Sequence, residues 1–143
     1  IRCLNELIPV YVEQLAPMAA DRGLDLSIDE QAQLWVKAPS RVIQIILTNL
    51  LRNAINYTQQ GSVVVRIRKS TISVIDTGIG MSPEELQHAF EPFYRGERSR
   101  ASSMGHGLGL SIVRRLVHQF DWPIHVQSNV GKGTEVTIEF FEG

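Results

Sequence analysis

The chain of 143 residues is poor in cysteine, in long apolar runs and in excess charge. Its one cysteine, Cys3, excludes an internal disulfide framework and a thiolate metal cluster. No uninterrupted apolar run approaches the roughly 18 residues that a transmembrane helix needs. The net charge of −1 gives no general attraction to nucleic acid or to an anionic membrane. What remains is a globular protein of ordinary composition, with 43% hydrophobic residues.

Several catalytic signatures are also missing. The chain has no P-loop pattern, no dinucleotide-binding G-x-G-x-x-G and no G-x-S-x-G nucleophile elbow. Its four histidines do not have the spacing of zinc ligands. The N-terminus has neither an initiator methionine nor a signal-peptide pattern, so we expect a piece of a longer protein. The length predicts a single domain over residues 1–143.

The hydrophobic periodicity predicts a mixture of helices and strands. Apolar positions at helical spacing predict helices at 7–22, 40–58 and 110–120, with a short helix after Ser82. Alternating or β-branched apolar residues predict strands at 24–28, 34–36, 63–68, 72–75, 122–128 and 135–141. Short connections predict two hairpins, the first joining 24–28 to 34–36 and the second joining 63–68 to the strand that ends at Asp76.

An acid and two glycines stand where one of these strands must end, in Asp76-Thr77-Gly78-Ile79-Gly80-Met81. An Asp at a strand end can accept hydrogen bonds from a ligand, and glycines allow close approach and positive φ. The alternative is an Asx-type turn, in which the acid bonds only its own backbone. Asp-Thr-Gly is also typical of aspartic proteases, but their nearly all-β fold disagrees with the two buried helices predicted at 40–58 and 110–120.

Two further segments break local rules. Asn49, Asn53, Asn56 and Tyr57 fall on one row of the helix predicted at 40–58, although Asn is a poor helix former. Such a row indicates function, and the alternative is a solvated face that happens to be rich in Asn. A polar loop then leads into glycine-rich residues 105–109 and a helix, an arrangement that suits phosphate because free N–H groups gather at a helix N-terminus.

Five segments, taken together and in order, resemble the N, G1, F, G2 and G3 boxes of the catalytic domain of sensor histidine kinases. They are Asn-Leu-Leu-Arg-Asn-Ala-Ile-Asn-Tyr-Thr (49–58), Asp-Thr-Gly-Ile-Gly-Met (76–81), Phe-Glu-Pro-Phe-Tyr-Arg (90–95), Gly-His-Gly-Leu-Gly-Leu-Ser-Ile-Val (105–113) and Gly-Lys-Gly-Thr (131–134). The resemblance covers nearly the whole chain. It implies an α/β two-layer sandwich with a mixed, mostly antiparallel sheet, helices on one face, and ATP between the long helix and a mobile lid.

The resemblance also implies roles for single residues. Asp76 would accept the adenine amino group, and Gly78 and Gly80 would give the base and sugar clearance. Asn53 would hold Mg²⁺ through its amide oxygen, assisted by Asn49. The other residues implied to border the nucleotide are Asn56, Tyr57, Met81 and Thr134, the last supporting the pocket from beneath.

On the phosphate side, the resemblance implies a lid. Arg95 and Arg98 would neutralise charge on the transferring phosphoryl group. The lid residues that would wrap the phosphates are Gly105, His106, Gly107, Leu108 and Gly109. Residues 96–106 are expected to be poorly ordered without nucleotide.

The chain departs from the pattern at two positions. Asn56 stands where many relatives carry Lys, which puts a phosphate contact there in doubt. Asn49 stands where hydrolytic cousins carry a Glu that activates water, and an amide cannot act as a general base. The resemblance therefore implies phosphotransfer rather than hydrolysis.

The partners follow from what the resemblance leaves out. No histidine of the chain has the context of the family's phosphoacceptor, so we expect a separate dimerisation domain of the same kinase to supply it. We expect a monomeric, cytoplasmic domain of an inner-membrane sensor, serving a response regulator indirectly, without nucleic-acid or direct membrane contact. A nucleotide-sensing module without transfer, or a serine-kinase-like enzyme, are the alternatives.

Overall fold

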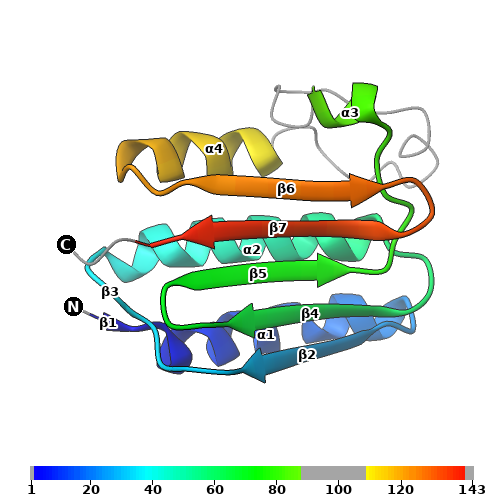
Figure 1. Ribbon diagram of the computed structural model, residues 1–143. Coiled ribbons are helices and arrows are strands. Elements are labelled where there is room, and N and C mark those ends of the chain that lie inside the picture. The colour runs from blue at the N-terminus through cyan, green and yellow to red at the C-terminus, as the bar shows by residue number, and fades with distance from the viewer. Residues whose placement is uncertain (1, 88–108, 141–143) are drawn as a thin grey trace.

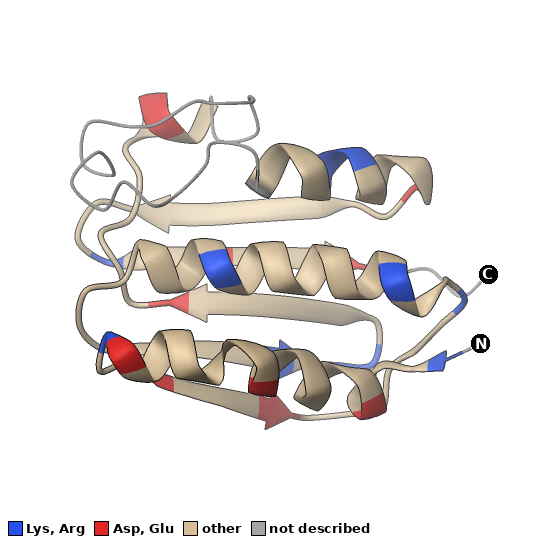
Figure 2. Cartoon of the chain, turned by 180° about the vertical axis from the view of Figure 1, so that it is seen from behind, with Lys and Arg blue, Asp and Glu red and all other residues tan. Residues whose placement is uncertain are grey.

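The computed structural model describes residues 2–87 and 109–140, which form a two-layer α/β sandwich (Figure 1). The helices are α1 (Leu4–Asp21), α2 (Ser40–Asn56), the short α3 (Pro83–Gln87) and α4 (Gly109–Gln119). Figure 2, which views the molecule from behind, shows α1, α2 and α4 lying side by side in front of the sheet. The predicted fold class is therefore confirmed, with the long helices together on one face.

The main sheet has five strands in the order β2-β4-β5-β7-β6. Their bounds are β2 (Asp25–Glu30), β4 (Ser62–Ile67), β5 (Thr71–Asp76), β6 (Ile124–Asn129) and β7 (Gly133–Glu139). Strands β2 and β4 run parallel, and every other neighbouring pair is antiparallel. The mixed, mostly antiparallel sheet was expected, and so was the β4–β5 hairpin.

The first predicted hairpin is wrong. Strand β2 does not pair with β3 (Trp35–Val36); it pairs in parallel with β4, in a register that places Asp25 opposite Ser62. Strand β3 instead pairs with β1 (Arg2–Cys3) in a separate two-stranded sheet. The segment between β2 and β3 cannot close a hairpin because it continues along β4, where the Gln31 N–H donates to the Ile67 carbonyl over 2.9 Å.

The inner face of the sheet, which meets the helices, is built in cross-strand rows. One row consists of isoleucines at Ile67, Ile72, Ile138 and Ile124, and the next consists of valines at Val65, Val74, Val136 and Val126. In both rows the residues of β4, β5 and β7 are at most 5% exposed. Full burial of one such side chain contributes about 1.5–3 kcal/mol, so these rows supply much of the stability.

Helix α2 covers the centre of this face. Its apolar stripe is buried throughout and comprises Ile43, Ile46, Leu47, Leu50, Leu51, Ala54 and Ile55. Helix α4 adds Leu110, Val113 and Val117, and Trp122 after it stacks on Phe120 with ring centroids 4.6 Å apart. The apolar spacing that predicted both helices is thus the spacing of the core.

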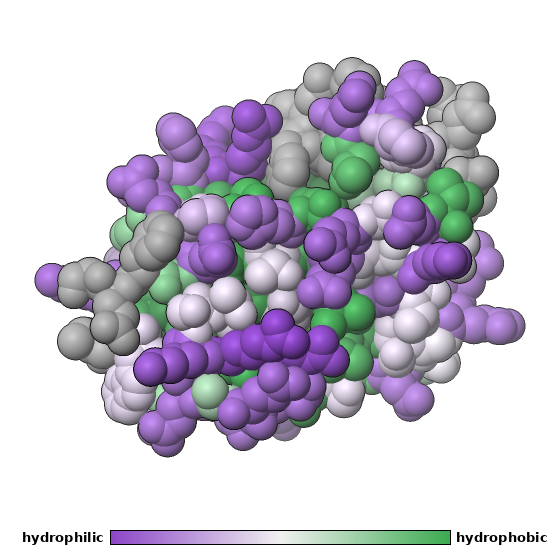
Figure 3. Space-filling view, in the orientation of Figure 1, coloured by the Kyte–Doolittle hydropathy of each residue, from purple (hydrophilic) through white to green (hydrophobic). Residues whose placement is uncertain are grey.

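The outer face carries polar and charged side chains. The space-filling view of this side shows hydrophilic residues around a paler band over the strands (Figure 3). Arg66 forms a 2.9 Å ion pair with Asp29, and the Ser73 and Thr137 hydroxyls lie 2.8 Å apart. No described helix combines the length and hydropathy needed to cross a membrane.

Candidate nucleotide site

The inner face changes character at one end of three adjacent strands. After the isoleucine and valine rows, the third row contains Val63 on β4, followed by Asp76, Thr134 and Ser128 on β5, β7 and β6. These three polar residues lie on the face that is otherwise aliphatic. A polar row at the end of an apolar face is the strongest candidate for a binding site in the described part of the chain.

Asp76 is the charged member of this polar row and is only 7% exposed. Its Oδ1 accepts hydrogen bonds from the Gly78 N–H over 2.9 Å and from the Thr134 N–H over 3.1 Å. Burial raises the pKa of Asp76 from 3.8 to about 6, although the two backbone hydrogen bonds act in the lowering direction. The acid is thus held in place at a considerable cost in desolvation.

The hydrogen bonds of Asp76 are compatible with both interpretations of this residue, as a turn former and as an acceptor for a ligand. The bond to Gly78 is the Asx-type turn, and the bond to Thr134 reaches 58 residues along the chain. Both bonds end on Oδ1, and within the described residues Oδ2 has no hydrogen-bond partner. One carboxylate oxygen therefore organises the protein while the other is available to accept a hydrogen bond from a ligand.

The loop after Asp76 is fixed on two sides by backbone groups. On one side the Ile79 N–H donates to the Tyr57 carbonyl at the end of α2, over 3.0 Å. On the other side the Gly131 N–H, in the turn between β6 and β7, donates to the Ile79 carbonyl over 2.7 Å. The loop thus connects the end of α2 to the end of the sheet.

The two glycines of this loop are required by packing. A Cβ on Gly78 would collide with the Tyr57 carbonyl, and a Cβ on Gly80 would collide with the Asn129 carbonyl. Gly80 also has a φ of +70°, which L side chains rarely adopt. These glycines let the loop lie directly against its neighbours; the clearance they would give a nucleotide stays a prediction.

The asparagine row of α2 lies along the helix that ends at this loop. Asn49 and Asn53 are half-buried and Asn56 is only 4% exposed, so the alternative of a solvated face does not hold. The Asn49 amide donates to the Ile45 carbonyl over 2.7 Å, within its own helix. The Asn53 amide has no hydrogen-bond partner among the described residues, which leaves its oxygen available to a ligand.

The C-terminal end of α2 is held from α1. Arg22, which follows α1, donates from Nη2 to the Asn56 carbonyl over 3.2 Å, so a cation sits at the negative end of the helix dipole. Thr58, which is fully buried, donates from its hydroxyl to the Ala54 carbonyl over 2.7 Å. These contacts fix the backbone on either side of Tyr57, whose carbonyl receives the Ile79 N–H.

The fit of a magnesium ion can be tested on the donor set. Within residues 2–87 and 109–140, no group of three or more His, Cys, Asp or Glu side chains could hold a metal by itself. Mg²⁺ commonly takes one or two protein oxygens and completes its shell with phosphate and water. The free Asn53 amide oxygen suits an ion that arrives with a nucleotide, and it does not suit a permanently bound metal.

Several predicted site residues lie outside the described residues. They are Arg95, Arg98, Gly105, His106, Gly107 and Leu108, together with the predicted lid at 96–106. Gly109 is the first residue of α4, one residue earlier than the predicted start of that helix. Of the predicted site residues that are described, Gly78 and Thr134 bind the Asp76 carboxylate directly. Gly80 and Met81 belong to the loop after Asp76, and Tyr57 accepts a hydrogen bond from that loop.

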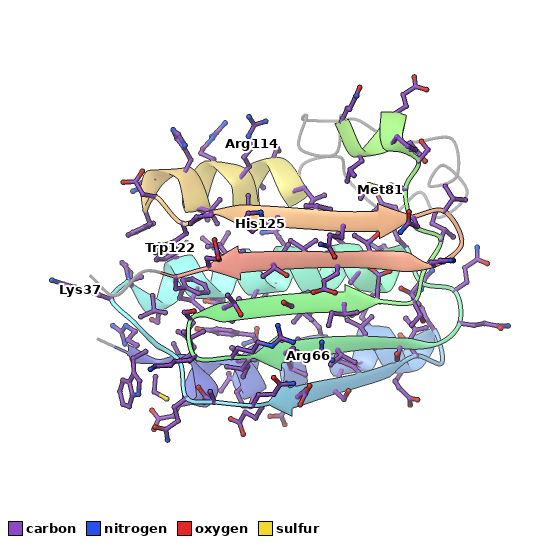
Figure 4. All side chains as sticks on the ribbon, in the orientation of Figure 1. Lys37, Arg66, Met81, Arg114, Trp122 and His125 are labelled. Atoms are coloured by element: carbon purple, nitrogen blue, oxygen red, sulfur yellow. The ribbon has the colours of Figure 1, made fainter. Side chains whose placement is uncertain are left out.

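The sequence prediction missed Ser128. Its Oγ accepts the Met81 N–H over 2.7 Å and lies 2.7 Å from the Thr134 Oγ1 (Figure 4 labels Met81 beside the end of β6). The signal was present in the sequence, because Ile124, Val126 and Ser128 occupy alternate positions of one strand. A serine in the inward phase of an otherwise apolar strand indicates a polar contact on the buried face.

Comparison with known proteins shows which family the chain resembles. Residues 38–142 match the family described as Histidine kinase-, DNA gyrase B-, and HSP90-like ATPase. Over 142 residues the chain is 35% identical to sensor histidine kinase YclK of Bacillus subtilis, covering 94% of this chain and 30% of that protein. It is 33% identical over 144 residues to sensor histidine kinase RppB of Synechocystis, covering 96% and 32%. The chain therefore spans about a third of the length of these relatives.

Solved structures agree on the fold. Full-length ShkA in complex with AMPPNP superposes with a TM-score of 0.83 at 27% identity, covering 96% of this chain and 29% of that one. The mycobacterial sensor histidine kinase MprB gives a TM-score of 0.82 at 26% identity, covering 97% and 95%. The second match covers nearly all of both chains, so the two share the fold over almost their full lengths.

Proposed function

Because the chain belongs to the family of histidine kinase-, DNA gyrase B- and HSP90-like ATPases, we propose that it binds ATP with Mg²⁺ at the polar row. The γ-phosphoryl group then passes to a histidine on a separate dimerisation domain of the same sensor kinase. The observation that carries this proposal is Asp76, whose buried carboxylate keeps Oδ2 free while Oδ1 is bound. An amino group of adenine is a donor that suits such an oxygen.

The residues of α2 support transfer over hydrolysis. In the reaction a ring nitrogen of the acceptor histidine attacks the γ-phosphorus, the bond to the β–γ bridging oxygen breaks, and ADP leaves. Hydrolysis would need a base to activate water, but Asn49 is an amide whose N–H is used within the helix. Bound Mg²⁺ would neutralise phosphate charge, with Asn53 as its protein ligand.

The remaining roles are proposals of the same kind. Arg95 and Arg98 neutralise charge on the transferring group, and the glycine-rich residues 105–109 wrap the phosphates. The chain works as the cytoplasmic catalytic part of a membrane-bound sensor, and a response regulator receives the phosphoryl group afterwards. The domain itself is monomeric.

The test separates binding from transfer. Binding of Mg-ATP to the chain is measured by calorimetry, and the chain is then mixed with [γ-³²P]ATP and the dimerisation hairpin of its own full-length protein. We expect micromolar to millimolar binding and acid-labile, base-stable label on the hairpin. Acid-stable label would identify a serine-kinase-like enzyme and contradict the proposal.

A second candidate is a nucleotide-sensing module. It is favoured by Asn56, a neutral residue at a position where many relatives carry a cation. Asn56 is 4% exposed, and its backbone carbonyl accepts a hydrogen bond from Arg22. Tight ATP binding without any label on a hairpin that a related kinase does phosphorylate would select this candidate.

A further inference from the structure

The hydroxyl of Ser128 occupies a junction that the proposed function does not explain by itself. We propose that Ser128 is a positioning residue for base recognition: it holds the loop 77–81 against the ends of β6 and β7 as a clamp, and so sets the position of Asp76 relative to the base. This inference rests on the proposed ATP site. It assigns to a strand residue, outside the glycine-rich segments, a role in nucleotide selectivity.

The first step is the geometry of the clamp. Asp76 and Ser128 stand on β5 and β6, on either side of Thr134 in the polar row. Asp76 joins Gly78 of the loop to the Thr134 backbone, and Ser128 joins Met81 of the loop to the Thr134 side chain. The loop is therefore tied to β7 and β6 at both of its ends.

The second step is the proton count at the two hydroxyls. Ser128 Oγ accepts the Met81 N–H and has one proton of its own, with the Gly133 carbonyl at 3.1 Å and the Thr134 Oγ1 at 2.7 Å as acceptors. If this proton goes to Gly133, the Thr134 hydroxyl donates to Ser128; otherwise Ser128 donates to Thr134. In both arrangements, removing the Ser128 hydroxyl releases the Met81 N–H and the Thr134 hydroxyl together.

The third step is a matched control on the same sheet. Ser73 and Thr137, on β5 and β7, form a hydroxyl pair with an oxygen separation of 2.8 Å, and Ser73 is 2% exposed. This pair lies on the outer face, and no hydrogen bond joins it to residues 77–81. Ser73→Ala thus removes the same kind of interaction from the same sheet while leaving the clamp unchanged.

The experiment compares Ser128→Ala with Ser73→Ala by calorimetry with Mg-ATP, Mg-ADP and Mg-GTP, together with Tm. For Ser128→Ala we expect about five- to tenfold weaker binding of ATP, the size of one hydrogen bond. ADP binding should weaken by the same factor, because the substitution disturbs the contact of Asp76 with the base, which ATP and ADP share, and not a contact with the γ-phosphate. The preference for ATP over GTP should fall, whereas Ser73→Ala should leave affinity and preference within about twofold.

The isosteric pair Ser128→Thr and Ser128→Val isolates the hydroxyl if alanine disturbs the strand. Threonine should retain the wild-type base preference and valine should lose it, at similar Tm. Equal base preference in all Ser128 variants, with wild-type binding intact, would overturn the positioning role alone. Failure of the wild-type chain to bind ATP would overturn the proposed function and this inference with it.

Discussion

The inner face of the sheet has two ends that differ in kind although they share the same strands and the same helix layer. At one end lie Ile67, Ile72 and Ile138, each at most 1% exposed and without a polar neighbour in the row. Two rows away lie Asp76 and Thr134, where a buried acid is held by backbone N–H groups. The apolar end stabilises the fold, whereas the polar end lowers its stability and carries the residues proposed to bind nucleotide.

The largest expected effect lies at the apolar end. Ile72→Ala should reduce the free energy of unfolding by about 2–5 kcal/mol, because it removes a buried side chain and leaves a cavity. Urea denaturation measures the loss, and ATP affinity of the folded protein should stay close to wild type. Ile75→Ala, in the outward phase of the same strand and half-buried, is the control and should cost less. Equal losses would remove the distinction between the faces.

The next effect concerns the stability of the polar end as a function of pH. The pKa of Asp76 is raised to about 6 in the folded chain, so between pH 4 and 6 the folded state binds more protons than the unfolded state. The stabilising contribution of the protonated form is complete below pH ~4 and is lost as pH rises through ~6. At 1.36 kcal/mol per pKa unit, the ionised carboxylate costs about 3 kcal/mol at pH 7.

Asp76→Asn tests this cost. Its amide oxygen can still accept the N–H groups of Gly78 and Thr134, but it carries no charge to desolvate. We expect the variant to be more stable than wild type at pH 7, by up to about 3 kcal/mol, with the difference gone at pH 4. Urea denaturation at the two pH values measures this difference in stability. A difference between variant and wild type that does not change with pH would contradict the raised pKa of Asp76.

The same variant should lose nucleotide affinity. A hydrogen bond to a charged group contributes about 1.5–3 kcal/mol, so Asp76→Asn should weaken ATP binding about tenfold to a hundredfold. Asp29→Asn makes the same chemical change on the outer face, where the acid pairs with Arg66, and should leave ATP binding unchanged. Calorimetry of both variants provides the comparison. Wild-type affinity in Asp76→Asn would remove this residue from base recognition.

The smallest effect is expected on α2. Asn53→Ala should weaken Mg²⁺-dependent ATP binding about five- to tenfold, the loss of a single ligand oxygen. Its neighbour Arg52 is exposed, and Arg52→Ala should change affinity by less than about twofold. Adding EDTA should abolish the difference between the two variants. If the difference persists without Mg²⁺, Asn53 does not act through the metal.

The sequence patterns correctly predicted those elements that depend on residues close together in the chain. The helical stripe of α2, the strand β4 and the short helix after Ser82 all appear in the structure, the last with reciprocal hydrogen bonds between Ser82 and Glu85. In the site, Asp76 was found because an acid at the end of an apolar strand is visible in the sequence. Its dual use of Oδ1 was not, because Thr134 is 58 residues away.

The wrong hairpin and the missed serine both depend on contacts between residues far apart in the chain. The pairing of β2 with β4 crosses the whole of α2, and nothing in residues 24–28 indicates which later strand they join. Ser128 was passed over for a similar reason, since the inward phase of β6 acquires meaning only beside Thr134 and Met81. Pairing partners depend on long-range contacts, which a single sequence records only indirectly.

The long separation between Tyr57, Asp76 and Thr134 has a consequence for the order in which the protein is assembled. The loop after Asp76 forms its last two hydrogen bonds, at Ile79 and Met81, with the β6–β7 hairpin, which is synthesised after the loop. A chain that ends before β6 would contain the acid, the glycines and the asparagines and would still have no closed site. Nucleotide bound at the completed site would favour the docked β6–β7 hairpin over the undocked one, and so would stabilise the last step in the assembly of the sheet.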